Sequence, residues 1–579
     1  MWNKPWTMKE GFLIGGGLIL AGLALELSVG PVVWEAFAWP ANGMVLAGFL
    51  ALIALIFILR KKVYAFRFLG TYQAAIPAMV YAVVLTIIMG LTRQQVDGTW
   101  LNNMLSFWPF VLIYMYIAVI LGVIILRRIF NFPLGRRTLA TNGTQEFSIF
   151  NLKRDIPFLL NHLGLFLALT TATLGNADMQ RVKMITTIGE PEWRALTAQG
   201  SIKEMPLAIE LKKFIMETYD DGSPKRFASD IQILTKTKKN IETTVDVNKP
   251  YEVDGWKIYQ YGYDTQMGAQ SQISILELVS DPWLPLVYTG IYMMLAGAVV
   301  LLLQGNNKKR RIKSEELRVM DWSSFIYFAM AAVLLWGVGA WAAWKEKTGM
   351  AYTTTVLGLL VFFSFILSMW ISLERPPLRT MGETRLWYSF FLPLAGLIVY
   401  SRWKYKWILS FSTVLALVFI CVNLFKPEIH DKTLMPALQS PWFAPHVIVY
   451  MFAYAVLGAA TVMAIYLLFF KKSAIADEEM DITDNLVYVG LAFLTIGMLF
   501  GALWAKEAWG HYWSWDPKET WAAITWLAYL VYVHYRQIPR HRERLALWML
   551  IGSFVLLQMC WWGINYLPSA QGSSVHTYS

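Results

Sequence analysis

Seven histidines are the side chains in this sequence best suited to bind a metal, and two of them lie at one depth. His162 lies five residues after Pro157, near the start of an apolar segment. His534 lies two residues before Arg536, near the end of another apolar segment. At about 1.5 Å of helical rise per residue, both positions fall close to the same face of a membrane. We therefore predict that these two imidazoles form a pair.

A second pair is predicted at the opposite face. His446 follows Pro445 at the start of an apolar segment, and His576 lies ten residues beyond Tyr566 in the C-terminal tail. Imidazole is a common axial ligand of haem iron. Two pairs at two depths suit a haem that takes two axial imidazoles and is moved outward, with these four histidines as its iron ligands. The other three histidines are interpreted as solvated (His430 and His541) or as part of a tryptophan-rich segment (His511).

The tryptophan-rich segment covers residues 501–526 and suits a flat ligand. Six tryptophans fall within 23 residues: Trp504, Trp509, Trp513, Trp515, Trp521 and Trp526. Tryptophan also gathers at membrane surfaces, but such a belt does not need the interleaved Gly, Asp, Lys and Glu residues found here. Indoles offer flat apolar faces and one N–H donor each, as a macrocycle with a polar edge requires. We expect the first five tryptophans to contact haem, Lys518 to pair with a propionate, and Asp516 to hold this binding segment in place.

The composition identifies the class of protein that positions these side chains. Apolar residues make up 56% of the 579 residues and charged residues 15%, against about 25% charged residues in soluble proteins. Apolar segments long enough to cross about 30 Å of hydrocarbon lie at 11–29, 41–59, 72–91, 105–126 and 157–175, with nine more between 282 and 566. We predict a polytopic α-helical membrane protein with about 13–15 transmembrane helices and one small, mostly β extracytoplasmic domain.

Charge and cysteine content exclude several other classes. The net charge of +11 comes from short basic loops between apolar segments, as the positive-inside rule expects, and not from a nucleic-acid-binding face. The two cysteines, Cys421 and Cys560, lie inside apolar segments and form no CxxC, which excludes a dithiol oxidoreductase, a cysteine zinc site and an iron–sulfur carrier. No GxxxxGK[ST] motif is present, which argues against an ATP-driven pump.

Residues 176–281 form the one polar stretch of domain size, and we predict an external β domain there. Its β-branched and aromatic runs are 206–218, 230–235, 252–263 and 272–278. The stretch has no Cys and no His, so docking or bracing is a better interpretation than catalysis. Five apolar segments then precede the loop at 426–445. If that loop and the β domain share a side, one segment between 322 and 403 does not span, or one span is missed.

The tryptophan-rich segment, with its lead-in from Gly501 to Trp509, closely resembles the WWD domain of the CcsA/ResC family of system II cytochrome c biogenesis. The resemblance extends from about Leu357 to the C-terminus. It includes Pro376 and Pro377 with Glu383, the run 438–442 before His446, and 572–578 around His576.

The upstream part resembles the ResB (CcsB) family. His162 matches that family's first intramembrane histidine, and the β domain shares a set of aromatic, Gly, Pro and polar positions. These are Leu211, Phe214, Tyr219, Gly222, Pro224, Phe227, Ser229, Asn248, Pro250, Gly255, Tyr259 and Gln260. The chain thus resembles a fusion organised as N-terminal spans (1–155), a ResB-like part (156–303, with its span at 282–303), a linker with an extra apolar segment (304–350) and a CcsA-like bundle (351–579).

The resemblance implies a holocytochrome c synthase in the bacterial cytoplasmic membrane. Haem b would be taken from the cytoplasmic side, exported, and joined to the CxxCH cysteines of apocytochrome c, whose thiols a separate partner would keep reduced. His162 and His534 would ligate haem at the inner site, and His446 and His576 at the external site beside the WWD segment. His511 is not one of the family's ligands, and we interpret it as a hydrogen-bond donor at the rim.

Two other functions remain open from the sequence. A haem exporter or chaperone that hands haem to a separate ligase would use the same four histidines and the same WWD segment. An ion or proton transporter could use the buried histidines as a relay, but few acidic residues lie in the apolar segments, and the tryptophans would be unexplained.

Overall fold

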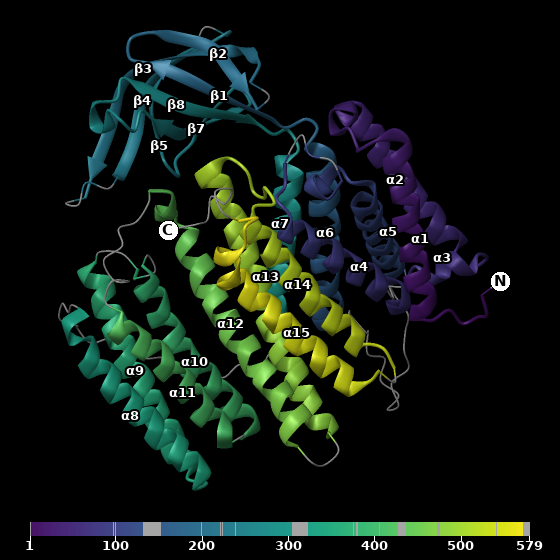
Figure 1. The fold of residues 1–579 in the computed structure, drawn as a ribbon, viewed down its shortest axis with the longest axis vertical. Helices are drawn as coiled ribbons and strands as arrows, with labels where there is room; N and C mark the ends of the chain where they lie inside the picture. The colour runs from purple at the N-terminus through teal and green to yellow at the C-terminus, as the bar shows by residue number, and fades with distance from the viewer. Residues whose placement is uncertain are drawn as a thin grey trace, which may run out of the picture.

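The computed structural model describes residues 2–570 except 96–97, 99, 131–151, 199, 220–221, 223, 238, 304–321, 374–375, 378–379, 405, 427–435, 472–474 and 540. Within these residues it contains a bundle of long helices and a β-sheet domain placed at one end of the bundle (Figure 1). We call this end of the helices the sheet end, and the opposite end the remote end.

The sheet domain is a single antiparallel sheet of eight strands in the order β5-β4-β3-β2-β1-β8-β7-β6. The strands are β1 (Gln180–Thr187), β2 (Pro191–Thr197), β3 (Ile202–Thr218), β4 (Pro224–Thr235), β5 (Asn240–Asp246), β6 (Tyr251–Val253), β7 (Trp256–Tyr263) and β8 (Ile273–Ser280). Alternate residues of the long strands are buried, for example Leu207, Ile209 and Leu211 of β3. One face of the sheet therefore carries its own apolar core.

The described part of the bundle has twelve helices that are long and apolar enough to cross a membrane. They are α1 (Met8–Val29), α2 (Ala41–Leu59), α4 (Tyr72–Leu91), α5 (Trp108–Phe130), α6 (Leu152–Gly175), α7 (Leu284–Leu303), α8 (Phe325–Trp344), α9 (Thr348–Ser372), α11 (Lys406–Phe425), α12 (Phe443–Ile465), α13 (Asp477–Trp509) and α15 (Glu543–Trp561). Two further helices, α10 (Met381–Trp403) and α14 (Pro517–Arg536), have similar lengths but are more polar, and α3 (Tyr64–Phe68) is short. The predicted fold class is confirmed: this is a multi-pass membrane protein with a small β domain.

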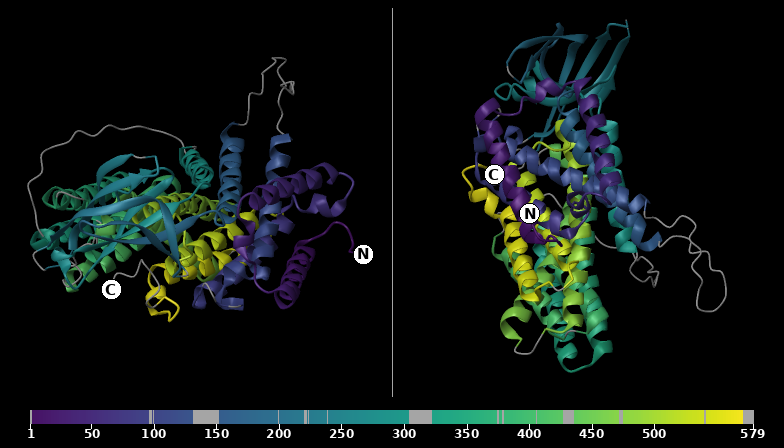
Figure 2. Two further views of the ribbon diagram at one scale, coloured as in Figure 1. Left: turned by 90° about the horizontal axis from the view of Figure 1, so that it is seen from above. Right: turned by 90° about the vertical axis from the view of Figure 1, so that its right-hand side faces the viewer.

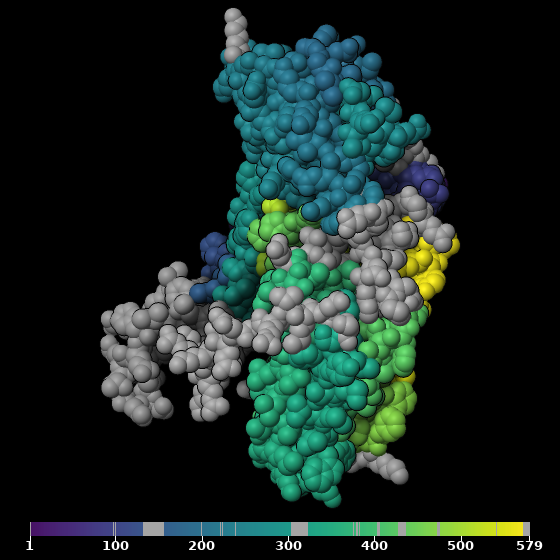
Figure 3. Space-filling model, turned by 90° about the vertical axis from the view of Figure 1, so that its left-hand side faces the viewer, coloured from purple at the N-terminus to yellow at the C-terminus, as the bar shows by residue number. Residues whose placement is uncertain are grey.

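The helices pack in three groups below the sheet. The N-terminal helices lie against α6 and α14, α7 packs between α6 and α13, and the C-terminal helices α12–α15 form the centre (Figures 1 and 2). The third group, α8–α11, meets the centre through α10 and α12. It forms the lower part of the face shown in Figure 3, with the sheet domain above it. Helix α14 packs along α4, so the N-terminal helices are part of the same bundle as the tryptophan-rich segment.

All five apolar segments between 282 and 425 are helices. Their odd number is explained by one connection, from α7 to α8, which joins opposite ends of the bundle. Helix α7 starts beside β8 and runs antiparallel to α6, so it ends at the remote end. Helix α9 ends at the sheet end. Helix α8 starts at the same end, because its first residue, Phe325, packs on Phe365 in the last turns of α9. Asn423, at the end of α11, donates to the Gly382 carbonyl at the start of α10. The residues that join α7 to α8, 304–321, lie outside the described residues.

Asp178 joins the N-terminal helices to the base of the sheet domain. Its carboxylate accepts hydrogen bonds from the Trp39 N–H at 2.7 Å, the Asn42 side chain at 2.7 Å and the Trp283 indole at 2.6 Å. These donors come from the start of α2 and from the residue before α7. Partial burial opposes ionisation, but the three hydrogen bonds outweigh it and hold the pKa of Asp178 below its ordinary value.

We expect Asp178→Ala to lower the free energy of unfolding by about 1–3 kcal/mol, because three donors lose a charged acceptor. The lowered pKa means that this stabilisation is complete above the ordinary Asp pKa of about 4 and is lost as the pH falls through the lower folded value. The difference in thermal midpoint between wild type and Asp178→Ala, measured in detergent, should therefore shrink below about pH 4. Glu252→Ala, which removes an ion pair with Lys257 on the surface of the sheet domain, is the control. A Tm unchanged by Asp178→Ala would contradict this bracing role.

Candidate functional site

The structure brings His162 of α6 and His534 of α14 together at the remote end. Their ring centres lie 6.4 Å apart with an interplanar angle of 70°. In each ring Nδ1 bonds the carbonyl oxygen four residues earlier, Phe158 or Leu530, at 2.8 Å. These bonds make Nδ1 the protonated nitrogen and leave Nε2 as the nitrogen that can ligate a metal.

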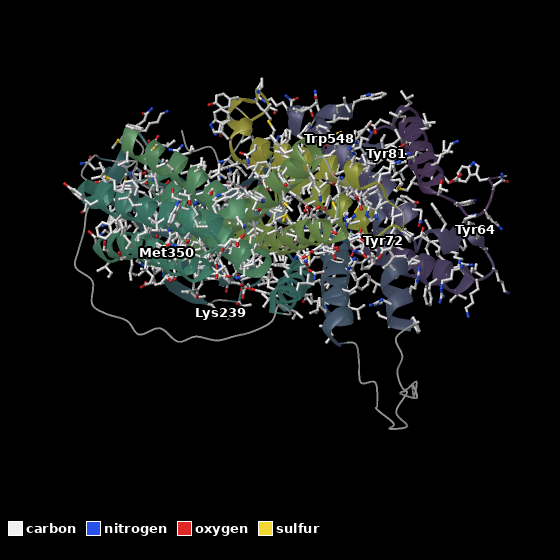
Figure 4. All side chains as sticks on the ribbon, turned by 90° about the horizontal axis from the view of Figure 1, so that it is seen from below. Tyr64, Tyr72, Tyr81, Lys239, Met350 and Trp548 are labelled. Carbon is white, nitrogen blue, oxygen red and sulfur yellow. The ribbon has the colours of Figure 1, made fainter. Side chains whose placement is uncertain are left out.

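Two aromatic rings flank this pair. Phe158 stacks on His162 with ring centres 4.0 Å apart, and the Tyr72 ring meets His534 edge-on at 6.3 Å. Figure 4 looks onto the remote end and shows Tyr72 where the N-terminal helices meet the central group. Each imidazole is therefore half-buried and has one aromatic neighbour, from α6 or from α4. Among the described residues, no three or more His, Cys, Asp or Glu side chains form a cluster that could hold a metal ion.

An ion pair that the sequence analysis did not identify fixes the end of α14 next to His534. The Arg536 guanidinium donates to both carboxylate oxygens of Asp484 at 2.7–2.9 Å, and the Tyr532 hydroxyl donates to the same carboxylate at 2.8 Å. Both charged side chains are mostly buried, and Arg536 also contacts His541. Asp484 follows four other acids at the start of α13, Asp477, Glu478, Glu479 and Asp481, so the sequence alone did not distinguish it from them.

At the sheet end, His446 lies against the lead-in of the tryptophan-rich segment. Its Nδ1 bonds the Gly497 carbonyl at 2.7 Å, and its ring centre lies 5.7 Å from that of Trp504 and 4.7 Å from that of Tyr450. The imidazole is therefore held between α12 and α13, with its orientation set by a backbone carbonyl. His576 and His430 lie outside the described residues, so the second predicted pair stays a prediction.

Gly501 is the residue that leaves room for the His446 ring. A Cβ atom at Gly501 would stand 2.7 Å from Cε1 and 2.9 Å from Nδ1 of His446. We expect Gly501→Ala to displace the imidazole and to lower the free energy of unfolding by about 1–3 kcal/mol, because the added methyl group overpacks the contact between α12 and α13. The thermal midpoint in detergent measures this effect. Gly552→Ala, where a Cβ meets nothing within 4 Å, is the matched control, and equal midpoints of the two variants would contradict the prediction.

The tryptophan-rich segment is a helix end, a loop and a helix start. Helix α13 ends at Trp509, and Gly510 follows in the left-handed conformation at φ 75°. Asp516 is the N-cap of α14: it accepts from the Lys518 N–H at 2.8 Å, and Glu519 closes the capping box. Asp516 thus holds the fold of the segment, the role expected for an acid that would repel propionates.

The six tryptophan side chains pack in separate places and do not form one continuous surface. Trp504 and Trp509 pack together near His446 with ring centres 4.9 Å apart. Trp513 and Trp515 contact each other, and Trp515 also packs on Phe110 and Tyr114 of α5. Trp521 is buried against Gly90 of α4, and the Trp526 indole donates to Thr495. Within the described structure, Trp504 therefore contacts His446, and Trp509 packs on Trp504.

The end of α13 is tied to the sheet domain. The Lys506 ammonium lies 3.5 Å from the Asp281 carboxylate, both side chains being almost fully buried, and donates to the Gly510 carbonyl. A Cβ at Gly510 would meet Val279 and Tyr259 of the sheet at 3.0–3.2 Å. Burial raises the pKa of the Tyr259 and Tyr512 hydroxyls at this junction, so both stay protonated at neutral pH.

The loop of residues 436–442, which precedes His446, is held by hydrogen bonds to α13 and to the sheet domain. Glu507 of α13 accepts from the Trp442 indole at 2.8 Å and from Ser440 at 3.2 Å. The Asn248 side chain of the sheet domain donates to the Pro436 carbonyl, and Gln439 donates to the Lys225 carbonyl. The sheet domain, the 436–442 loop and the tryptophan-rich segment thus form one connected structure. His511, expected at its rim, is buried, while Lys518 is half-buried.

The fold and these junctions define a multi-pass membrane protein whose sheet domain is built onto a helix bundle with a tryptophan-rich loop. Residues 381–570 match the family described as Cytochrome C assembly protein, and residues 153–276 match the ResB-like family. The chain belongs to the cytochrome c assembly (CcsA) family and is a system II fusion of the CcsBA type, with the ResB-like part first. Its role is in cytochrome c biogenesis.

Two relatives illustrate the extent of this similarity. The cytochrome c biogenesis protein CcsA of Marchantia polymorpha is 28% identical over 313 residues, which cover 45% of this chain and 97% of that protein. CcsA of Atropa belladonna is 30% identical over 273 residues, which cover 39% of this chain and 86% of that protein.

Proposed function

We propose that the chain receives haem at the remote end, moves it to the sheet end and holds it there while it is attached covalently to the CxxCH motif of apocytochrome c. The observation that carries this proposal is the separation of His162 and His534. A metal–imidazole bond is about 2 Å long and the ring centre lies about 1 Å beyond the nitrogen, so two axial rings on one iron stand roughly 6 Å apart. The 6.4 Å between these ring centres fits one iron between them.

The sheet-end site is proposed from His446 and its neighbours. Trp504 offers a flat apolar face beside an imidazole oriented by the Gly497 carbonyl, and Trp509 packs on Trp504. His576 is proposed as the second ligand by family resemblance. Lys518, at the first turn of α14, is proposed to pair with a propionate. Trp513 and Trp515 stay in the proposal as parts of the loop, and Trp521 as the ring that packs this loop on α4.

Attachment depends on positioning by this chain more than on acid–base chemistry. Each thiol of CxxCH adds across a haem vinyl group: sulfur bonds one vinyl carbon, and the thiol proton ends on the other carbon, with no net change in electrons. The chain's contribution is to hold the macrocycle so that its vinyl groups meet two thiols in a dry site. The thiols must arrive reduced, so a thiol-reducing partner is part of the proposal.

The proposed membrane is the bacterial cytoplasmic membrane, with the sheet domain and the WWD segment outside. Its support is the distribution of basic residues. The remote end carries Arg60 to Lys62, Arg127, Arg128 and Arg536, whereas few basic residues lie in the short connections at the sheet end. Cytoplasmic loops carry this kind of excess.

A haem exporter that serves a separate ligase is the competing function. The buried contact of Lys506 with Asp281 and the hydrogen bonds of Asn248 and Gln439 favour the synthase, because they build the sheet domain onto the WWD segment. A carrier alone would not need such a domain. The transporter hypothesis gains nothing from the acids inside the bundle, since Asp484 is paired with Arg536 and Glu26 accepts from the Trp108 N–H.

Expression of the full chain with an apocytochrome c, in a bacterium lacking its own maturation proteins, distinguishes the two functions. A synthase yields cytochrome with haem that survives denaturing electrophoresis, and none when both CxxCH cysteines are replaced by serine. Free haem outside the cytoplasm without covalent product would favour the exporter. Absence of both would contradict the proposed function.

A further inference from the structure

The helices α4 and α5 contribute to the remote-end histidine pair although neither family match includes them. The ResB-like match begins at residue 153, after both helices. Tyr72 of α4 nevertheless lies beside His534, and α5 ends beside the first turns of α6. The site is thus partly built by a region to which the family comparison assigns no function.

Arg128, near the end of α5, lies one aromatic ring away from His162. Its guanidinium carbon stands 5.2 Å from the centre of the Phe158 ring, and Phe158 stacks on His162 at 4.0 Å. A guanidinium is permanently charged and binds carboxylates through two parallel hydrogen bonds.

The neighbouring Arg127 has a different role. Its Nη1 donates to the Gly70 carbonyl at 2.7 Å, which joins α5 to the turn before α4, and its side chain is exposed. Arg128 is half-buried and faces the aromatic ring that covers His162. Two adjacent arginines on one helix therefore form a matched pair, one directed to the backbone and one to the histidine site.

We propose that Arg128 binds a carboxylate of the haem held between His162 and His534. Haem carries its two carboxylates at the rim of the macrocycle, so a cation one ring away from an axial imidazole is placed to meet one of them. The charge on Arg128 makes the site selective for a tetrapyrrole with free carboxylates over a neutral one. This inference rests on the proposed function, because it concerns the same haem.

The test uses the full chain in detergent, freed of haem, in a His446→Ala background so that binding reports the remote-end pair. Haem and haem dimethyl ester, which lacks the negative charges, are titrated while the Soret band is recorded. Arg128→Gln should weaken haem binding about tenfold, as loss of a charged hydrogen bond does, and leave ester binding unchanged. Arg127→Gln should alter neither, and Arg128→Lys should keep most of the preference for haem.

Each of the other outcomes contradicts either the role of Arg128 or the proposed function. A preference for haem that persists in Arg128→Gln, or that falls equally in Arg127→Gln, overturns the role of Arg128. Haem binding that survives His162→Ala and His534→Ala overturns the proposed function itself. Thermal midpoints of all variants show whether a loss comes from unfolding, and Arg128→Lys tests the charge if Arg128→Gln does not fold.

Discussion

The single variants His162→Ala and His534→Ala should each lose most of the haem bound at the remote end, so that less haem is purified with the protein. The two rings stand 6.4 Å apart and are proposed to hold one iron between them, so loss of either ring leaves the iron with a single imidazole. We expect haem content to fall at least about fivefold, with the remaining haem changing from low-spin to high-spin. The optical spectrum of the purified protein measures both effects.

Added imidazole provides the specific control for this prediction. Because each replaced side chain leaves the volume of one ring, free imidazole should restore the low-spin spectrum in either variant. His541→Ala removes a histidine at the same end that contacts Arg536, and it should keep the wild-type spectrum. A wild-type spectrum in both ligand variants would show that these histidines do not bind the iron.

Asp484→Ala should have the largest effect on stability. It leaves the mostly buried Arg536 guanidinium and the Tyr532 hydroxyl without their shared acceptor. Removing one partner of a buried ion pair costs about 3–5 kcal/mol. Since Arg536 lies two residues after His534, we also expect weaker haem binding at the remote end. The thermal midpoint and haem content of the purified protein report the two effects.

Two matched variants make the result specific to the ion pair. Asp481 lies on the same helix and is exposed, so Asp481→Ala should leave both readouts unchanged. The double variant Asp484→Leu with Arg536→Leu removes both charges and should recover much of the stability lost in the single variant. A single variant as stable as wild type would show that the pair does not fix the end of α14.

The bounds of a helix could be predicted from the sequence where a long apolar run defines that helix. The runs at 41–59 and 72–91 are α2 and α4 with unchanged bounds. Strands β1, β2 and β5 were not among the predicted runs. In β5 only Val245 is buried, so its sequence has no apolar pattern to reveal it, and it forms because β4 pairs with it.

The depth of His162 and His534 could be predicted from their neighbours in the chain, because helical rise converts position into height. Phe158 lies one helical turn before His162, so its contact also follows from the spacing. The contacts from other helices could not be predicted: Tyr72 meets His534 from α4, and Asp484 meets Arg536 from α13, and only tertiary packing decides which faces meet. The same holds at the other end, where Lys506 finds Asp281 across 225 residues.

One comparison of spectra and product tests most directly whether haem passes from the remote pair to His446. Wild type, His162→Ala and His446→Ala are purified from cells that also make an apocytochrome c, and bound low-spin haem and covalent cytochrome are measured together. We predict that His446→Ala keeps haem at the remote pair while covalent cytochrome falls, and that His162→Ala loses both. Normal cytochrome yield in His162→Ala, with haem retained at His446, would contradict the order of transfer.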